Sequence, residues 1–472
     1  MTGPNVPGQP APRSSSSTST REGREGSGGP RRVRPSWHPA GLRSPARLRQ
    51  LGVLVLLGLL AAVVTGPTGN SDHPLRAAWD SIADPRIVLF LVIAVVVWLV
   101  VALGGQLRTL AVRWATPVRE PVGAAYGRRG GPIALNLALL AVAIIAPMLF
   151  STAAQQWMVD GVGIYALLAL GLNVVVGYAG LLDLGYIAFF AIGAYTTAYF
   201  TSQTAMPWHA PFTLNPFFVF PIALLLAALA GVVLGAPTLR LRGDYLAIVT
   251  LGFGEIIHLV ANNADGVTNG ARGAFGVPHL SIHLLGIDYT WGIDPLPYYY
   301  LLLAIIVIVM IAFGRLERSR IGRSWAAIRE DEIAAEATGV ATLQLKLLAF
   351  AIGASVSGFA GVLFASKQFF NPQSFSLQAS FFIVAVVIFG GMGSRLGVVV
   401  GAVVLQGLAF YLRDLVAPAD RYIYFGAVIV TMMIFRPQGL VPSRRRRREI
   451  ELSEAGVGAA DALGAAPTGA RP

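Results

Sequence analysis

The stretch RLERSRIGRSWAAIREDEIAAEATGVAT, residues 315–342, lies between two long apolar runs, residues 298–313 and 345–365. Arginines crowd its first half, and four acidic residues lie among alanines in its second half. Alanine is the best helix former, so the stretch predicts a polar helix. A polar, charged helix between two apolar runs lies at a membrane surface and can dock another molecule there.

Composition places the rest of the chain in the membrane. Of 472 residues, 55% are hydrophobic and only 13% are charged, and the mean hydropathy is +0.63. A soluble protein of this length could not cover that much apolar surface, so the chain is predicted to be an all-α, polytopic membrane protein. The net charge of +12 is typical here of cytoplasmic loops, and we expect no nucleic-acid partner.

The two ends of the chain have a different composition. Residues 1–50 are rich in Ser, Pro, Gly and Arg, lack the apolar residues for a core, and predict a disordered tail. This tail is too long and polar for the start of a signal peptide, so the first apolar run is interpreted as a retained helix. Residues 443–472, basic and then rich in Ala and Gly, predict a second disordered tail.

Twelve apolar runs approach the length of a membrane span, which is about 20 residues. Some are short, so we expect roughly 10–12 transmembrane helices. The runs comprise residues 51–64, 87–103, 133–150, 161–176, 185–201, 217–235, 245–262, 298–313, 345–365, 379–390, 397–412 and 422–434. We interpret residues 51–150 as an extension with about three helices, and residues 161–442 as the functional core.

The connections between the apolar runs alternate between arginine-rich and arginine-poor sequence. Arginine gathers in the N-terminal tail, in residues 107–129, 240–242 and 315–329, and again near the C-terminus, whereas the long connection 263–297 holds only Arg272. Positively charged connections stay in the cytoplasm. This rule predicts a cytoplasmic membrane protein with both termini inside, and with a cytoplasmic loop over residues 315–343.

Two membrane segments are interrupted by glycine. Residues 171–195 contain Gly177 and four other glycines, and residues 389–405 contain five, including Gly390 and Gly391. Glycines permit broken helices, and such segments in two parts of a chain indicate a transport pathway. The alternative is a tight connection between antiparallel spans, and the sequence leaves both readings open.

Few polar side chains fall inside the apolar runs. Glu255 and, three residues on, His258 share one helix face, and a charge at mid-membrane requires a partner or a watery cavity. Glu255 could bind a substrate ammonium or form a structural hydrogen bond between helices. Asn173 could line the pathway or join two helices, and Asp183 could line it or cap a helix end.

Motifs for catalysis are missing from the sequence. It has no cysteine, no glycine-lysine-serine or -threonine phosphate loop, no HExxH and no GxSxG. We therefore expect a transporter without catalysis, metal or bound cofactor. Uphill transport would depend on an ion gradient or on another subunit.

Five blocks of the sequence occur in an order that resembles a known family. The blocks are GLNVVVGYAGLLDLGY (171–186), LRLRGDYLAIVTLGFGEI (239–256), REDEIAAEATGV (329–340), FGGMGSRLG (389–397) and FRPQGLVP (435–442). They resemble the LivM-type permease subunits of bacterial branched-chain amino acid ABC importers over residues 161–442. The resemblance implies the ABC importer permease fold.

The resemblance also gives the polar stretch a role. ABC permeases carry a cytoplasmic coupling helix that sits in a groove of the ATP-binding subunit. Two alanines followed by a glycine match this helix, while Ile333 stands where a glutamate normally precedes the alanines. Without the resemblance, a plain solvated connector is the alternative. The residues implied in coupling are Arg329, Glu330, Asp331, Glu332, Ala334, Ala335 and Gly339, the last of which we expect to end the helix.

The implied function is import of leucine, isoleucine or valine, driven by ATP hydrolysis in partner subunits. The implied partners are two ATP-binding subunits, a second related permease chain and an extracytoplasmic substrate-binding protein. Three alternatives remain: a urea or short-chain amide importer, a proton-coupled secondary transporter that uses Glu255, and an intramembrane enzyme.

Overall fold

The computed structural model describes residues 131–239, 244–284, 287–413, 421–436 and 438–443. The disordered tail proposed for residues 1–50, residues 51–130 of the extension proposed for residues 51–150, and all but the first residue of the C-terminal tail lie outside the described residues. So do the first two apolar runs of the sequence.

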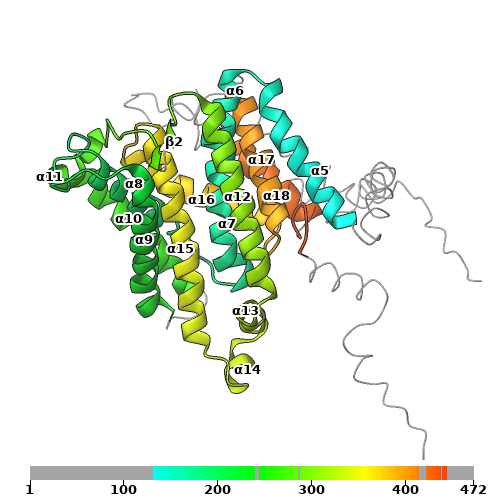
Figure 1. The fold of residues 1–472 in the computed structure, drawn as a ribbon. Coiled ribbons are helices and arrows are strands. Elements are labelled where there is room, and N and C mark those ends of the chain that lie inside the picture. The colour runs from blue at the N-terminus through cyan, green and yellow to red at the C-terminus, as the bar shows by residue number, and fades with distance from the viewer. Residues whose placement is uncertain (1–130, 240–243, 285–286, 414–420, 437, 444–472) are drawn as a thin grey trace, which may run out of the picture.

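Helices form about three quarters of the described chain (Figure 1). Each of the ten apolar runs within the described residues falls on a helix, so the all-α, polytopic architecture is confirmed. The principal helices are α5 (Gly131–Ile145), α7 (Ile164–Asn173), α8 (Ile187–Thr201), α9 (Pro216–Thr238), α10 (Asp244–Asn263), α12 (Pro295–Arg318), α15 (Thr342–Lys367), α16 (Leu377–Gly390), α17 (Arg395–Leu412) and α18 (Arg421–Phe435).

Seven helical stretches within the described residues are long and apolar enough to cross a membrane, and three shorter apolar helices accompany them. One of the seven, Thr152–Tyr178, is not a regular α-helix. It joins α6 (Thr152–Trp157), the π-helical turn η3 (Met158–Gly163), α7, and a second π-helical turn, η4 (Val174–Tyr178). Neither π turn was predicted, because an apolar run does not reveal the register of the backbone hydrogen bonds.

Helix α15 occupies the centre of the bundle, where it packs against α7, α8 and α9. Glycines bring these helices close: a Cβ atom at Gly193 of α8 would lie 2.1 Å from the Gly358 carbonyl oxygen of α15. Helices α10 and α12 bury far fewer of their residues than the stretch Thr152–Tyr178 does. Side chains facing lipid need not be polar, so exposed apolar residues on such outer helices are expected.

The short elements gather at the two ends of the bundle (Figure 1). One end, called here the α14 end, carries α13 (Arg320–Glu330) and α14 (Glu332–Ala337). The other, called the hairpin end, carries the antiparallel strands β1 (Ser281–Leu284) and β2 (Ile287–Thr290), in which Ser281 pairs with Thr290. The remaining elements are η2 (Ala146–Leu149), α11 (Asp265–Thr268), η5 (Gly270–Arg272) and η6 (Pro372–Phe375).

Candidate functional site

The chain turns at the α14 end through two polar helices rather than the single helix expected from the sequence. The Ser319 hydroxyl caps α13 by accepting a hydrogen bond from the Gly322 amide (3.3 Å). Trp325 of α13 is completely buried, and its indole donates to the Leu345 carbonyl of α15 (2.7 Å). This contact fixes α13 against the first turn of the central helix.

Asp331 is the reason that the polar stretch breaks in two. Its backbone is extended, and its carboxylate accepts a hydrogen bond from the Ala334 amide (3.0 Å). An aspartate that satisfies the third amide of a following helix is an N-cap. The acidic residue that the sequence placed within the coupling helix therefore starts α14 and separates it from α13.

Gly339 ends α14, as the sequence predicted. Its φ of +86° is in the left-handed region that glycine adopts without strain. The Val340 amide donates to the Ala335 carbonyl (3.1 Å) and the Gly339 amide donates to the Glu336 carbonyl (2.9 Å). These two bonds form a Schellman motif, so both ends of this six-residue helix are fixed.

One face of α14 is open. Ala335 is buried, whereas Ala334, Glu336 and Ala337 are exposed, and Ile333 is 73% exposed. An ideal Cβ at Gly339 would have nothing within 4 Å. Small side chains around one large apolar side chain allow another protein to approach closely.

Glu332, the first residue of α14, connects it to α15. Its carboxylate forms an ion pair with the ammonium of Lys346, whose side chain is only 7% exposed. Because α14 is short, this ion pair and the caps determine its position. The family resemblance implied Glu332 in coupling, but the sequence did not select Lys346.

The two glycine-interrupted segments meet next to α13, on the side of the helix bundle. The Asn173 side-chain oxygen accepts a hydrogen bond from the Gly393 amide (2.8 Å), which joins the end of α7 to the turn after α16. Arg329 of α13 donates to the Gly177 carbonyl. A Cβ at Gly177 would lie 2.6 Å from the Gly393 nitrogen, so glycine is required for this approach.

Gly390 and Gly391 lie at the tight turn between α16 and α17. The Leu440 and Val441 amides donate to the carbonyls of Phe389 (2.9 Å) and Gly390 (3.1 Å). Gly391 has a φ of +115°. The connection between antiparallel spans that the sequence left open is therefore present here, with the chain after α18 packed against it.

A cavity of about 530 Å³ opens beside this junction. Its lining mixes both signs of charge with backbone of the interrupted segments. It is lined by Gly177, Tyr178, Glu317, Gly322, Arg323, Ala326, Arg329, Glu330, Ile388, Met392, Gly393, Gln438 and Ser443.

Asp183 lies in the irregular segment between η4 and α8 and is fully buried. Its Oδ1 atom accepts a hydrogen bond from the Gly185 amide (3.0 Å), while Oδ2 has no hydrogen-bond partner among the described residues. The Leu184 amide donates to the Thr250 hydroxyl of α10 (3.1 Å), and the Ser380 hydroxyl of α16 donates to the Leu184 carbonyl (2.5 Å). Irregular backbone is thus held among helices α10 and α16, as buried irregular backbone in a membrane must be.

Glu255 follows Gly254, where α10 approaches Gly185. It is half-buried, and no hydrogen bond or ion pair joins its carboxylate to any other described residue. His258, one turn further, is held: its Nδ1 atom lies 3.0 Å from the Pro372 carbonyl oxygen. The structural hydrogen bond considered for Glu255 is therefore absent from the described part of the chain.

The residues selected from the sequence fall into three groups. The coupling residues lie at the α14 end. Asn173, Gly177, Gly390 and Gly391 meet at the junction above them, and Asp183, Glu255 and His258 lie along the contact of α10 with its neighbours. Among the described residues, no cluster of three His, Cys, Asp or Glu side chains could hold a metal.

Comparison with known proteins extends this description. A model of the family described as "Branched-chain amino acid transport system / permease component" matches residues 156–436. No solved structure matches the chain.

Three known permeases are similar to about two thirds of the chain. It is 38% identical to the high-affinity branched-chain amino acid transport system permease protein LivM of Salmonella typhimurium, over 68% of this chain and 77% of that protein. Identity to the LivM protein of Escherichia coli is 39%, over 67% and 76% of the two chains. Identity to a probable LivM protein of Methanocaldococcus jannaschii is 25%, over 60% of this chain and 91% of that one.

Proposed function

The chain belongs to the family of branched-chain amino acid transport permeases, and from this premise we propose that it is the permease subunit of an ATP-driven importer for leucine, isoleucine and valine. It is a transport permease and a multi-pass membrane protein. ATP is hydrolysed by separate subunits, and this chain binds no cofactor of its own.

The α14 end faces the cytoplasm in this proposal. Described arginines at that end outnumber those at the hairpin end, and the positive-inside rule assigns the richer end to the cytoplasm. The α14 end carries Arg315, Arg318, Arg320, Arg323, Arg329, Arg395 and Arg436, and the hairpin end carries Arg272, Arg413 and Arg421.

The ion pair between Glu332 and Lys346 is the observation that supports coupling most directly. Helix α14 offers an open face to the ATP-binding subunit, and this ion pair connects the opposite face to the central helix. When ATP binding moves its partner, α14 moves with it and displaces α15. Such rigid displacements switch packed helices between two arrangements. Arg329, Glu330, Asp331, Ala334, Ala335 and Gly339 position or form this surface.

Residues 161–442 form the permease core, and the substrate passes along its interrupted segments. Gly177 lines the cavity at the cytoplasmic mouth, next to the turn that contains Gly390 and Gly391, and Asn173 joins the two segments. Asp183, Glu255 and His258 line the path deeper in the membrane. The carboxylate of Glu255 has no partner among the described residues, which supports a role as transient partner of the substrate ammonium, since a pathway must release what it binds.

The partners are two ATP-binding subunits, a second related permease chain and an extracytoplasmic binding protein, which delivers substrate at the hairpin end. The test is uptake by proteoliposomes that contain the whole complex. Labelled leucine should accumulate only with internal ATP and external binding protein, and collapse of the proton gradient should not stop it. Uptake of urea instead, or leucine uptake that follows the proton gradient, would contradict the proposal.

A further inference from the structure

Lysine is nearly absent from this chain, and its positions are informative. Of 36 basic residues only Lys346 and Lys367 are lysines. Both belong to α15, 21 positions apart, which is about 31 Å along a helix. They therefore mark the two ends of the central helix, and their side chains are only 7% and 5% exposed.

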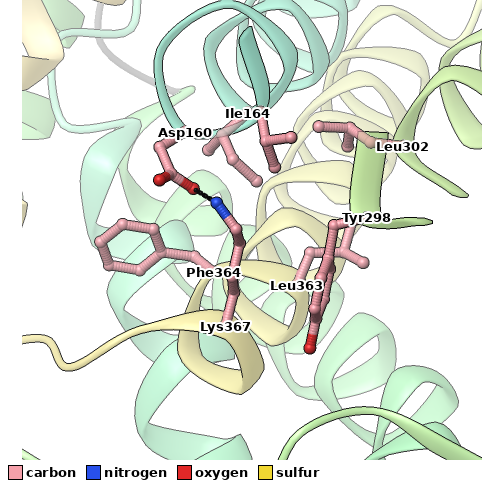
Figure 2. A pocket seen from close by; sticks show the side chains of 8 residues that line it. Asp160, Ile164, Tyr298, Leu302, Leu363, Phe364 and Lys367 are labelled. Carbon is pink, nitrogen blue, oxygen red and sulfur yellow. Dashed lines mark hydrogen bonds and ion pairs between the residues drawn. The ribbon is translucent and has the colours of Figure 1, made fainter. Parts of the chain in front are cut away.

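Each lysine is paired with an acidic residue from a different element. At the α14 end the partner is Glu332 of α14. At the hairpin end Lys367 forms an ion pair with Asp160 of the π turn η3, with 2.5 Å between Nζ and Oδ1 (Figure 2). The second oxygen of Asp160 accepts a hydrogen bond from Gln156 (3.2 Å). Helix α15 is thus connected by charge to the proposed coupling helix and to the opposite end of the molecule.

The surroundings of Lys367 are apolar. Figure 2 shows Ile164, Leu302, Leu363 and Phe364 around the pair, and the cavity beside it measures only about 10 Å³. This volume has room for about one water molecule. The Asp160 side chain is 21% exposed, but that of Lys367 is only 5% exposed, so Asp160 is the main partner of this ammonium and links η3 to α15.

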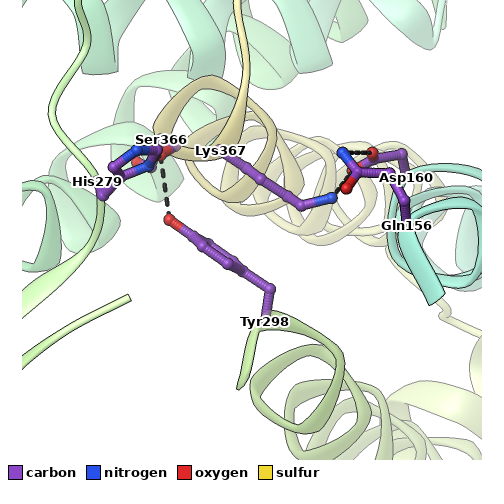
Figure 3. A network of polar contacts seen from close by, with 6 residues as sticks. All are labelled: Gln156, Asp160, His279, Tyr298, Ser366 and Lys367. Carbon is purple, nitrogen blue, oxygen red and sulfur yellow. Dashed lines mark hydrogen bonds and ion pairs between the residues drawn. The ribbon is translucent and has the colours of Figure 1, made fainter. Parts of the chain in front are cut away.

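Further hydrogen bonds hold the same end of α15. The Ser366 carbonyl accepts a hydrogen bond from the Tyr298 hydroxyl of α12 (3.1 Å), and the His279 Nδ1 atom lies 3.0 Å from it (Figure 3). These contacts involve a backbone carbonyl, whereas the Asp160–Lys367 pair is the charged link of this network. The π turn around Asp160 adds a second feature, since single π turns in helices are frequent at functional sites.

We propose that α15 transmits the movement of α14 to the hairpin end of the molecule, and that Asp160 and Lys367 are positioning residues for transport. A displacement of α14 passes through Glu332 and Lys346 to α15, and through Lys367 and Asp160 to η3. The inference rests on the proposed coupling role of α14. It adds the path by which coupling reaches the face where substrate enters.

The packing of α15 fits a sliding motion. Gly358 approaches the Ala223 backbone of α9, and Gly361 approaches the Phe190 backbone of α8. Small residues at these points bring the helix backbones together, while the ring pairs Phe220–Phe359 and Phe190–Phe364 pack elsewhere along the same two interfaces. Packed helices of this kind move by small shear displacements.

The first test removes the charged link at the hairpin end without leaving an unpaired charge. The double variant Asp160→Asn/Lys367→Met is reconstituted in the whole complex. The number of leucine molecules imported per ATP hydrolysed is measured, and the melting temperature of the variant complex is measured beside it. We expect hydrolysis to continue while import per ATP falls by about 5- to 150-fold, the range of ordinary allosteric coupling. The charge exchange Asp160→Lys/Lys367→Asp should restore much of the import per ATP.

Tyr300→Phe is the matched control. It removes a hydrogen bond from α12 to the Ile144 carbonyl at the same end (3.1 Å) but leaves α15 untouched, so import per ATP should be unchanged. Wild-type import per ATP in the double variant would overturn the inference. Failure of the unmodified complex to import leucine would instead overturn the proposed function, and this inference with it.

A second measurement does not require that double variant to fold. Because the chain has no cysteine, spin labels can be placed at Ala153→Cys and Thr213→Cys, two exposed sites in α6 and in the connection before α9. Their separation should change when a non-hydrolysable ATP analogue is bound, and Lys346→Met should abolish that change. The inference would be overturned if the label separation did not change in the complex that retains Lys346. It would also be overturned if the separation changed by as much in Lys346→Met.

Discussion

At the scale of single residues, the polar side chains and the glycines are the most informative. Apolar side chains are so common in this chain that a single one indicates little. Glu255 and Gly185 illustrate the two kinds. One is a carboxylate without a partner among the described residues, and the other is a glycine that another backbone touches.

Glu255→Gln should leave stability unchanged and weaken transport. The carboxylate makes no hydrogen bond or ion pair with a described residue, so the protein loses no contact when its charge is removed. Membrane level and melting temperature should match wild type while leucine uptake falls. His258→Ala is the contrast, since it loses the contact with the Pro372 carbonyl and should cost about 0.5–1.5 kcal/mol of stability. A loss of protein from the membrane in Glu255→Gln would contradict this reading.

Gly185→Ala should destabilise the protein. The added Cβ would lie 1.9 Å from the Thr250 carbonyl oxygen, and this neighbour is backbone that cannot rotate away. Overpacking of this kind costs about 1–3 kcal/mol, which thermal melting in detergent can detect. Gly252→Ala, in the same helix as Thr250, has nothing within 4 Å of its Cβ and should be neutral or stabilising. Equal melting temperatures for the two variants would refute the close contact.

The sequence could identify these residues but could not give their partners. Glu255 and Asn173 were selected because polar groups are costly in a membrane, and the structure adds that Asn173 binds the Gly393 amide. The ion pairs of Lys346 and Lys367 were missed. The rarity of lysine was visible in the sequence, but a pairing between distant elements depends on tertiary packing. The roles of the pathway and coupling residues stay predictions.

At the scale of elements, α14 depends on its caps, because six residues are too few to form a stable helix alone. Asp331→Ala removes the N-cap and should cost about 1 kcal/mol. Hydrogen exchange of the α14 amides should speed up, and leucine import per ATP should fall. Asp331→Asn should restore both, since its side-chain oxygen can accept the same bond. Unchanged exchange in Asp331→Ala would show that the cap does not hold the helix.

Ala334→Arg tests the open face of α14. The residue is exposed and lies within the helix, so a large charged side chain fits without strain in this chain alone but should block docking of a partner. We expect normal folding, unaltered membrane level and loss of uptake. Gln344→Arg, exposed at the start of α15, is the control. Gly339→Arg would not separate docking from folding, because the φ of +86° at this position strains the backbone of any residue with a side chain. Normal uptake in Ala334→Arg would contradict the coupling role.

The helices and the two glycine-rich interruptions were predictable from the sequence, and the other irregular elements were not. Apolar runs of sufficient length located the ten principal helices, although α12 and α15 extend several residues beyond their runs into polar sequence. The π turns, the β1–β2 hairpin and the break between α13 and α14 depend on particular hydrogen bonds. One of these, the Asp331 cap, could have been recognised from an aspartate before a short alanine-rich segment.

At the scale of the whole molecule, the proposed orientation in the membrane rests on the distribution of arginine. Ile333 at the α14 end and Ile293 near the hairpin are 73% and 83% exposed. In this cysteine-free chain, Ile293→Cys should react with a membrane-impermeant maleimide added to spheroplasts. Ile333→Cys should react only after permeabilisation. The reverse pattern would invert the proposed orientation.

The most direct measurement of the central claim is cross-linking from the same two positions in the assembled complex. A photoreactive maleimide is attached to Ile333→Cys or to Ile293→Cys, and the product is identified by mass spectrometry. We predict a cross-link from position 333 to an ATP-binding subunit, sensitive to ATP, and none from position 293. Absence of that product from position 333, with the complex intact, would contradict the account of α14 as the coupling helix.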